Sequence, residues 1–335
     1  MNVAEQRDTK VRRKFVDLIG TRLDGYELVE KVGEGAFSVV YKGQNSDGEY
    51  KAFKVARSKP DYKPALTGCF GTEAMVVMSG AIGTGHPSGQ ALLSRQFDLM
   101  NKLGAALVPA ENFQQEVLSY IRMPLLHGSS LRDLMKNEAI SLDCLVKIAE
   151  ALCATFKNEG EYHGDLKPEN IIICNGNCQL IDPGYFGEIE SANGPLVEMK
   201  ITTGEYYPLL VPNDIMAFGL IMLEIVLQKN LLAQKSSLSQ MPSSCAGKSL
   251  LEKISRQERG YNYFFSSILR LGNKSQESLK LKNSPLCGII LKCLALQIDI
   301  NGVVDLGEAY TSHAQVLRDL SSIDSTGFGV SSNAV

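Results

Sequence analysis

The sequence has no hydrophobic run that approaches the roughly 20 residues of a membrane-spanning helix. It also lacks a strong excess of either charge, since the formal net charge is −3. That balance gives no reason to expect nucleic acid or a membrane surface as a partner. The first residues, Met1 to Arg13, are polar and charged and do not form the apolar core of a secretory signal. These absences favour a cytoplasmic location, with specialised export as the open alternative.

Cysteine blocks with metal-ligand spacing are also absent, although the chain contains eight cysteines. One close pair, Cys174 and Cys178, flanks the dipeptide Asn175-Gly176. Asn-Gly is a strong hairpin signal because both residues can adopt positive φ. We interpret the two cysteines as small residues of a hairpin, with a disulfide or metal site as the alternative. A reducing compartment is the default for this cysteine usage.

The most informative motif runs from His163 to Asn170 and is followed by Asp182-Pro183-Gly184. Phosphoryl transfer needs a carboxylate that orients the attacking hydroxyl, a cation near the transferring phosphate, and oxygen ligands for Mg²⁺. Asp165 and Lys167 supply the first two groups. Asn170 and Asp182 supply hard oxygen ligands suited to Mg²⁺. The motif therefore predicts phosphoryl transfer with Asp165 as the catalytic base.

An upstream motif predicts the nucleotide site. Gly33-Glu34-Gly35 opens the pattern of a glycine-rich phosphate loop, with Ser38 at the third glycine position. Glycines at 33 and 35 would let backbone N–H groups approach phosphates without an intervening Cβ. The run from Lys51 to Ala56 alternates like a strand and places Lys54 where it can bind the α- and β-phosphates.

These motifs, in this order, make the chain resemble Hanks-type serine/threonine protein kinases over about residues 26 to 225. The resemblance implies an α+β, two-lobed fold with a small β-rich N-lobe and a larger helical C-lobe. It implies ATP and Mg²⁺ as cofactors, and transfer of the γ-phosphoryl group to serine or threonine of a protein substrate. It also implies a set of adenine-site residues: Val40, Ala52 and Ile172 around the base, Met123 at the gate and Leu125 in the interlobe linker.

On this basis the chain divides into a leader helix (1–25), an N-lobe (26–124), a C-lobe (125–320) and a flexible tail (321–335). Residues 57–90 form an insertion in the N-lobe, either a docking or regulatory element or a plain elongated loop. Three strand-like runs lie between Tyr26 and Ala56. Apolar spacing predicts helices over 91–103, 142–158, 212–227, 249–270 and 286–320.

Three positions depart from the family pattern. Gln96 stands where a glutamate would pair with Lys54, and glutamine can accept a hydrogen bond from Lys54 but cannot form an ion pair with it; Glu73 is the other candidate partner. Gly164 replaces an arginine that would meet a phosphorylated activation loop, so we do not expect that switch. Pro183 replaces a phenylalanine and restricts rearrangement after Asp182.

A fourth departure is a coupled loss. The family's Ala-Pro-Glu block and its late arginine partner are both missing, and Tyr206-Tyr207-Pro208 runs almost directly into Asp214. A buried carboxylate without its partner is costly, so losing both groups is easier than losing one. We infer a shortened substrate-docking region. The resemblance also implies that Asp214, at the start of a long apolar helix, accepts hydrogen bonds from the catalytic-loop backbone.

Two other functions stay open. A small-molecule kinase of the aminoglycoside or choline type would fit the His163-Gly164-Asp165 motif, although Lys167 and the full glycine-rich block argue against it. A nucleotide-binding pseudokinase scaffold would fit Gln96 and Pro183, although the predicted catalytic residues are all present. The sequence defines neither the protein substrate nor the oligomeric state.

Overall fold

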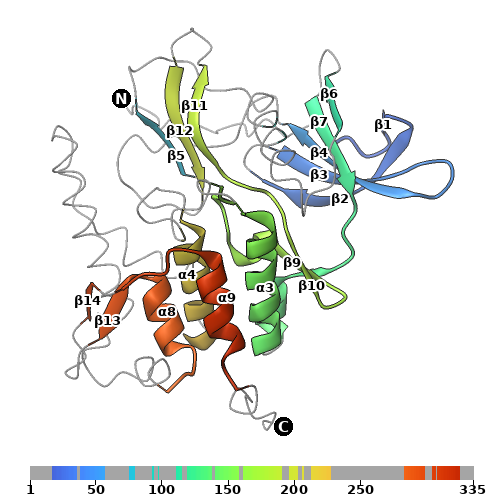
Figure 1. Cartoon of the computed structure of the whole chain (residues 1–335). Helices are drawn as coiled ribbons and strands as arrows, with labels where there is room; N and C mark the ends of the chain where they lie inside the picture. The colour runs from blue at the N-terminus through green and yellow to red at the C-terminus, as the bar shows by residue number, and fades with distance from the viewer. Residues whose placement is uncertain are drawn as a thin grey trace, which may run out of the picture.

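The computed structural model describes residues 17–35, 38–56, 75–79, 93, 97, 111–114, 119–137, 140–157, 161–190, 196–202, 206, 213–227, 283–298, 304–306 and 308–324. These residues form a curled antiparallel sheet followed by helices, a two-lobed α+β fold of the protein-kinase kind (Figure 1). Most of the predicted leader helix, the helix predicted over 249–270, and both Glu73 and Gln96 lie outside the described residues.

The N-lobe is a six-stranded antiparallel sheet in the order β1-β2-β3-β4-β7-β6. The three strand-like runs predicted between Tyr26 and Ala56 are confirmed as β2, β3 and β4. Alternate residues of these strands point into one core, as a half-buried sheet requires, and Leu28, Val39 and Phe53 are fully buried there. The strands are β1 (Arg22–Leu23), β2 (Tyr26–Glu34), β3 (Ser38–Gln44), β4 (Tyr50–Ala56), β6 (Glu111–Gln114) and β7 (Ser119–Pro124).

The helical lobe has one large hydrophobic core. The helices described are α2 (Leu131–Asn137), α3 (Leu142–Thr155), α4 (Asp214–Leu227), α8 (Cys287–Cys293) and α9 (His313–Ser321). The helices predicted over 142–158 and 212–227 are confirmed as α3 and α4. The hydroxyl of Ser141 caps α3 by accepting a hydrogen bond from the backbone N–H of Cys144.

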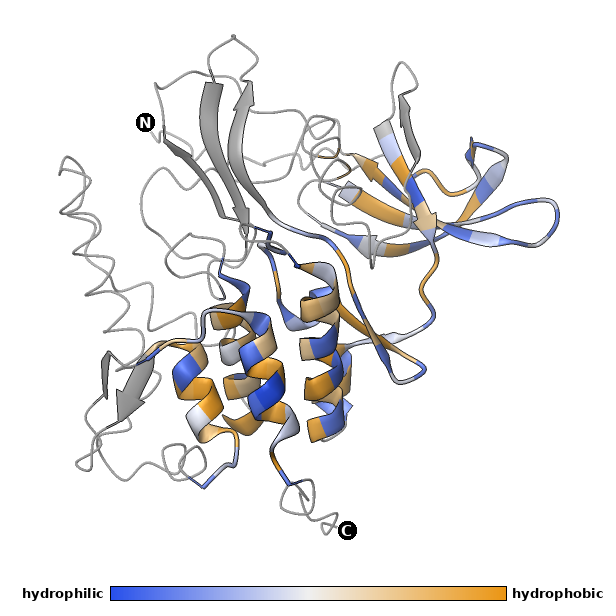
Figure 2. Ribbon diagram, in the orientation of Figure 1, coloured by the Kyte–Doolittle hydropathy of each residue, from blue (hydrophilic) through white to orange (hydrophobic). Residues whose placement is uncertain are grey.

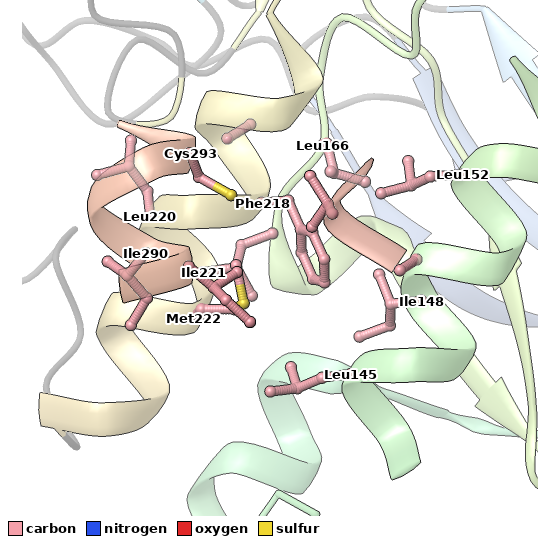
Figure 3. Close-up of a cluster of buried hydrophobic side chains, with 14 of the residues drawn as sticks. Leu145, Ile148, Leu152, Leu166, Phe218, Leu220, Ile221, Met222, Ile290 and Cys293 are labelled. Carbon is pink, nitrogen blue, oxygen red and sulfur yellow. The ribbon is translucent and has the colours of Figure 1, made fainter. Parts of the chain in front are cut away.

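Side chains from α3, α4 and α8 meet in that core (Figure 3). A Cβ added at Gly219 of α4 would lie only 2.5 Å from the Cβ of Cys293, so glycine is what lets α4 and α8 approach closely. Hydrophobic and hydrophilic residues alternate around α3 and α9, as expected for helices with one buried face (Figure 2). None of the described helices has the length and hydrophobicity needed to cross a membrane.

A small sheet underlies the catalytic motif. It has the order β10-β9-β8, from β8 (Ser129–Ser130), β9 (Ile171–Cys174) and β10 (Asn177–Leu180). Asn175 and Gly176 have φ values of 50° and 74°, which confirms the predicted hairpin turn. Cys174 and Cys178 are both free thiols. Burial raises the pKa of Cys178 to about 12, so this thiol stays protonated and unreactive at neutral pH.

The prediction of continuous helix over 286–320 is wrong in its middle. Between α8 and α9 the chain forms a two-stranded antiparallel sheet of β13 (Leu296–Ile298) and β14 (Val304–Leu306). Ala295, with φ at 53°, ends the helical path after α8. The intervening Asn301-Gly302 is a turn signal, and the neighbouring β-branched residues favour strands over helix.

Candidate active site

The glycine-rich pattern forms the hairpin between β2 and β3. Gly33 is the register partner of Val40, and the backbone N–H of Gly35 donates to the carbonyl oxygen of Ser38 at 2.9 Å. A Cβ added at Gly33 or Gly35 would meet its nearest neighbour at 3.7 Å, an ordinary contact. The fold itself therefore does not demand glycine at these two positions, which leaves close approach of a ligand as a reason for them.

Lys54 and Asp182 meet across the two lobes. Lys54 lies on β4 between Val40 on β3 and Ile121 on β7, and it is 6% exposed. Its Nζ donates to Oδ1 of Asp182 at 2.8 Å. Burial would raise the pKa of Asp182, but the charge and hydrogen bond of Lys54, aided by Lys167, hold that pKa below its ordinary value. Asp182 is therefore ionised at neutral pH.

Asn170 connects the carboxylate of Asp165 with the backbone of Asp182. It ends the short 3₁₀ helix η1 (Pro168–Asn170) and is 5% exposed. Its Nδ2 donates to the carbonyl oxygen of Asp165 at 2.8 Å, to Oδ2 of Asp165 at 3.1 Å and to the carbonyl oxygen of Asp182 at 3.2 Å. One amide group thus fixes Asp165 relative to Asp182.

Lys167 lies beside Asp165, with its Nζ 3.0 Å from Oδ2 of that carboxylate. Burial favours the neutral amine, but the Asp165 carboxylate outweighs it and raises the pKa of Lys167. Lys167 is therefore a cation at physiological pH. The arrangement places a fixed positive charge next to the carboxylate that the sequence singles out as the base.

Asp214 and His163 hold the backbone of this loop. Asp214, the first residue of α4, accepts hydrogen bonds from the backbone N–H groups of His163 at 2.5 Å and Gly164 at 3.0 Å, as the resemblance implies. The ring of His163 contacts the carbonyl oxygen of Ile181 at 2.9 Å, and its Nδ1 accepts from the N–H of Asp165 at 3.3 Å. Burial lowers the pKa of His163, so the ring is neutral and structural.

One departure from the family pattern, Gly164, has a backbone explanation. Gly164 has φ at 76°, in the left-handed region that glycine adopts without strain. Asp182 has φ at 56°, which is uncommon for a residue with a side chain. The N–H of Gly184, after Pro183, donates to the carbonyl oxygen of His163 at 2.8 Å. This hydrogen bond holds the turn that presents the Asp182 carboxylate to Lys54.

The predicted adenine-site residues come from four strands and the segment between the lobes. Ala52 on β4 is the register partner of Met123 on β7. Met123 is half-buried and packs against the small cluster around Ile121, so it also has a core role. The remaining members are half-buried aliphatic residues: Val40, Leu125 and Ile172.

A buried ion-pair network beside the catalytic loop is the main feature that the sequence analysis missed. Arg132 of α2 donates through Nε to Glu169 at 2.8 Å. Its Nη2 lies 3.1 Å from Oε2 of Glu224 in α4. The hydroxyl of Tyr206 accepts from Arg132 at 2.7 Å and donates to Glu224 at 2.6 Å. Burial and the Glu224 carboxylate raise the pKa of Tyr206, so it keeps this proton.

This network joins the catalytic loop, α2, α4 and the chain before α4. A signal for it was present in the sequence, because Glu224 interrupts an otherwise apolar helix. A buried carboxylate needs a partner. Residue spacing alone offers no means of locating that partner at Arg132.

No protein-family profile matches the chain. It is 26% identical over 182 residues to a probable serine/threonine-protein kinase of Clostridium perfringens, covering 52% of this chain and 23% of that protein. It is 26% identical over 237 residues to a probable serine/threonine-protein kinase of Dictyostelium discoideum, covering 67% of this chain and 42% of that protein. With cyclin-dependent kinase 4 of Xenopus laevis it shares 25% identity over 236 residues, 64% of this chain and 67% of that protein.

The chain is a divergent relative of the serine/threonine protein kinases. The matches are low in identity, but they agree with the two-lobed fold and with the meeting of Lys54, Asp165, Asn170 and Asp182 described above. The chain spans less than half the length of the Clostridium and Dictyostelium relatives. Activity, substrate and partners are therefore inferred from the residues of this kinase-like chain itself.

Proposed function

We propose that the chain is a protein kinase that uses ATP and Mg²⁺ to phosphorylate serine or threonine of a protein substrate. The observation that carries this proposal is the convergence of residues from distant parts of the sequence. Lys54 contacts Asp182 at 2.8 Å, and the amide of Asn170 connects Asp182 with Asp165. Phosphoryl transfer depends mainly on such positioning and on charge stabilisation.

Asp165 is the proposed base. Its Oδ2 accepts from Nδ2 of Asn170 and contacts Nζ of Lys167, and these two groups fix the orientation of the carboxylate. In this role Asp165 would orient the substrate hydroxyl and take its proton as the new O–P bond forms and the bond from the γ-phosphorus to the leaving ADP oxygen breaks. Lys167 offsets the negative charge that develops on the transferring group, where a fixed cation is most effective.

Asn170 and Asp182 are the proposed Mg²⁺ ligands, and their chemistry fits the ion. Within the described part of the chain, no group of three or more His, Cys, Asp or Glu side chains could hold a metal by itself. Mg²⁺ at kinase sites is commonly bound by one or two protein groups plus substrate phosphates and water. Bound Mg²⁺ would supply charge neutralisation at the phosphates, with Asp182 and the amide oxygen of Asn170 as its protein ligands.

The nucleotide would lie between the glycine hairpin and the catalytic loop. Lys54 would exchange its bond to Asp182 for the α- and β-phosphates, and the N–H groups around Gly33 and Gly35 would approach the phosphates. The proposed adenine contacts are aliphatic and suit a flat apolar ring: Val40, Ala52, Met123, Leu125 and Ile172.

The decisive experiment incubates the pure protein with γ-labelled ATP, Mg²⁺ and a basic protein acceptor. Asp165→Asn is the matched control, because it keeps the size of the side chain and removes the base. We expect label on serine or threonine with the wild type, and a loss of at least about a hundredfold with the variant, the usual contribution of a general base. Wild type that binds ATP but labels no acceptor would contradict the proposal and support a scaffold.

A further inference from the structure

A strand from the insertion pairs with the segment that follows the catalytic motif. That strand, β5 (Met75–Ser79), belongs to the chain between β4 and residue 93, and it forms a three-stranded sheet in the order β11-β12-β5. Its antiparallel partner is β12 (Leu196–Thr202), in a register from Met75 with Thr202 to Ser79 with Glu198. Figure 1 shows β5 beside β12, separate from the six-stranded sheet.

The partner hairpin begins immediately after the proposed metal ligand. Its first strand, β11 (Tyr185–Glu190), starts three residues after Asp182. The N–H of Gly184 ties this start to the catalytic loop through the carbonyl oxygen of His163, and Tyr206 is fixed beyond β12 by Arg132 and Glu224. We call residues 182–206 the activation segment. The described contacts therefore hold it at both ends, and β5 holds its middle.

Backbone pairing of this kind does not depend on a phosphate group. A phosphorylated activation segment is ordered by cationic partners, arginine above all. Position 164 carries glycine, and its N–H is bonded to Asp214. The strand ladder, by contrast, uses main-chain groups that are present in the unmodified chain. The β-branched Val76 and Val77 favour the extended conformation that the ladder needs.

The insertion is also tied to the strand that carries Lys54. It follows Ala56, the last residue of β4, and precedes Leu93. Leu93 is 4% exposed and packs in one cluster with Ala56 and Ile121. The segment that contains β5 is therefore anchored at both ends to the wall of the proposed phosphate site.

We propose that β5 orders the activation segment without phosphorylation, and that it thereby keeps Asp182 and the substrate-facing side of the site in their working arrangement. This inference rests on the proposed kinase function. It assigns the insertion a regulatory role: the activity is set by the presence of the β5–β12 pairing, which a binding partner or a cleavage within the insertion could remove.

The test variant is Val76→Pro/Val77→Pro. Alternate N–H groups of β5 point towards β12, so replacing two adjacent residues removes at least one ladder donor. The matched control is Val76→Thr/Val77→Thr, which keeps two β-branched residues and both N–H groups. Retention of the ATP-induced rise in melting temperature shows that each variant is folded.

The first readout is hydrogen exchange in residues 196–202, which does not require activity. We expect exchange at least about tenfold faster in the proline variant and unchanged in the threonine control, because local opening follows the loss of pairing. Unchanged exchange in the proline variant would overturn the inference.

The second readout is phosphoryl transfer before and after phosphatase treatment. We expect the proline variant to lose at least about tenfold in rate, the factor that about 1.4 kcal/mol produces, and the wild type to keep its rate after phosphatase. A proline variant with faster exchange but full activity would overturn the regulatory role, as would a wild type inactivated by phosphatase; both would leave the kinase proposal standing. Wild type without transfer would refute the kinase proposal, and the regulatory role with it.

Discussion

Glycines in this chain serve two different purposes. The distance from an added Cβ to its nearest neighbour distinguishes them. At Gly43 that Cβ would lie 2.5 Å from the Phe53 ring, whereas at Gly33 the nearest atom would be 3.7 Å away. The first glycine is required by packing between β3 and β4. Gly33 has room for a side chain, so we propose that glycine at this position lets a ligand approach the backbone.

We therefore expect opposite results from two alanine substitutions. Gly43→Ala should reduce the free energy of unfolding by about 1–3 kcal/mol, the usual cost of overpacking. Gly33→Ala should leave stability within about 0.5 kcal/mol while weakening ATP binding. Urea unfolding and an ATP titration followed by calorimetry measure the two effects. Normal ATP affinity in Gly33→Ala would remove the phosphate-loop assignment from this residue.

The Lys54–Asp182 pair makes a second residue-scale prediction, which concerns pH. The folded pKa of Asp182 lies below the unfolded value of about 4, because Lys54 outweighs the effect of burial. A depressed carboxyl pKa stabilises the fold above the unfolded pKa, and this contribution is lost as pH falls through the folded pKa.

Lys54→Met removes the partner and keeps the length of the side chain. Compared with the wild type, it should be less stable at pH 7, and the difference should shrink at pH 3. Urea unfolding at both pH values measures this difference. The contributions of the other carboxyl groups to the pH dependence cancel, because both proteins contain those groups. A difference that stays constant with pH would show that the pair does not control the ionisation of Asp182.

At the scale of elements, α4 carries one member of a buried ion pair, and another helix carries the partner. Glu224 is fully buried, and Arg132 of α2 and Tyr206 supply its partners. Replacing one member of a buried pair leaves an uncompensated charge, whereas replacing both with apolar residues is often neutral. The network should therefore behave non-additively.

We expect Arg132→Met to reduce the free energy of unfolding by about 3–5 kcal/mol. The double variant Arg132→Met/Glu224→Met should recover a large part of that loss. Arg318→Met is the control, because Arg318 lies on the exposed side of α9 and pairs with Asp319 near the surface. Urea unfolding of the wild type, the single variants Arg132→Met and Glu224→Met, and the double variant gives the coupling energy. Strict additivity of the two single variants would show that Arg132 and Glu224 do not act as a pair.

Elements with a strong local pattern could be predicted from the sequence, and elements with non-local partners could not. The apolar run of α4, the Asn175-Gly176 turn and the alternation of β4 carry their own signals. The β13–β14 pair was missed because its strands are short and lie within a long apolar stretch. The pairing of β5 with β12 depends on register between distant segments, which no local pattern encodes.

The candidate site shows the same division. The catalytic motif was readable because Asp165, Lys167 and Asn170 are close in sequence. Their order along the chain did not reveal that one amide joins Asp165 to Asp182, or that Lys54 contacts Asp182 directly. The pairing of Gln96 with Lys54, in the helix expected over 91–103, stays a prediction.

At the scale of the whole molecule, the two lobes meet at the proposed nucleotide and metal site. Lys54 comes from the six-stranded sheet, and Asp182 comes from the loop above the helical core, so a ligand that binds both groups stabilises the two lobes together. Anything that binds the folded state and not the unfolded state raises the melting temperature, and the stabilisation grows with the logarithm of the ligand concentration above the dissociation constant.

We expect Mg²⁺ with ATP to raise the melting temperature of the wild type more than ATP with a chelator does. At a ligand concentration of about 100 times the dissociation constant, the stabilisation is about 2.7 kcal/mol. Asp182→Asn should lose the Mg²⁺-dependent part of this shift, because an amide oxygen carries no charge for the ion. Asp47→Asn, in an exposed turn of the N-lobe, should keep it. An equal Mg²⁺-dependent shift in Asp182→Asn and the wild type would show that the ion is held elsewhere, and the assignment of Asp182 as its ligand would be wrong.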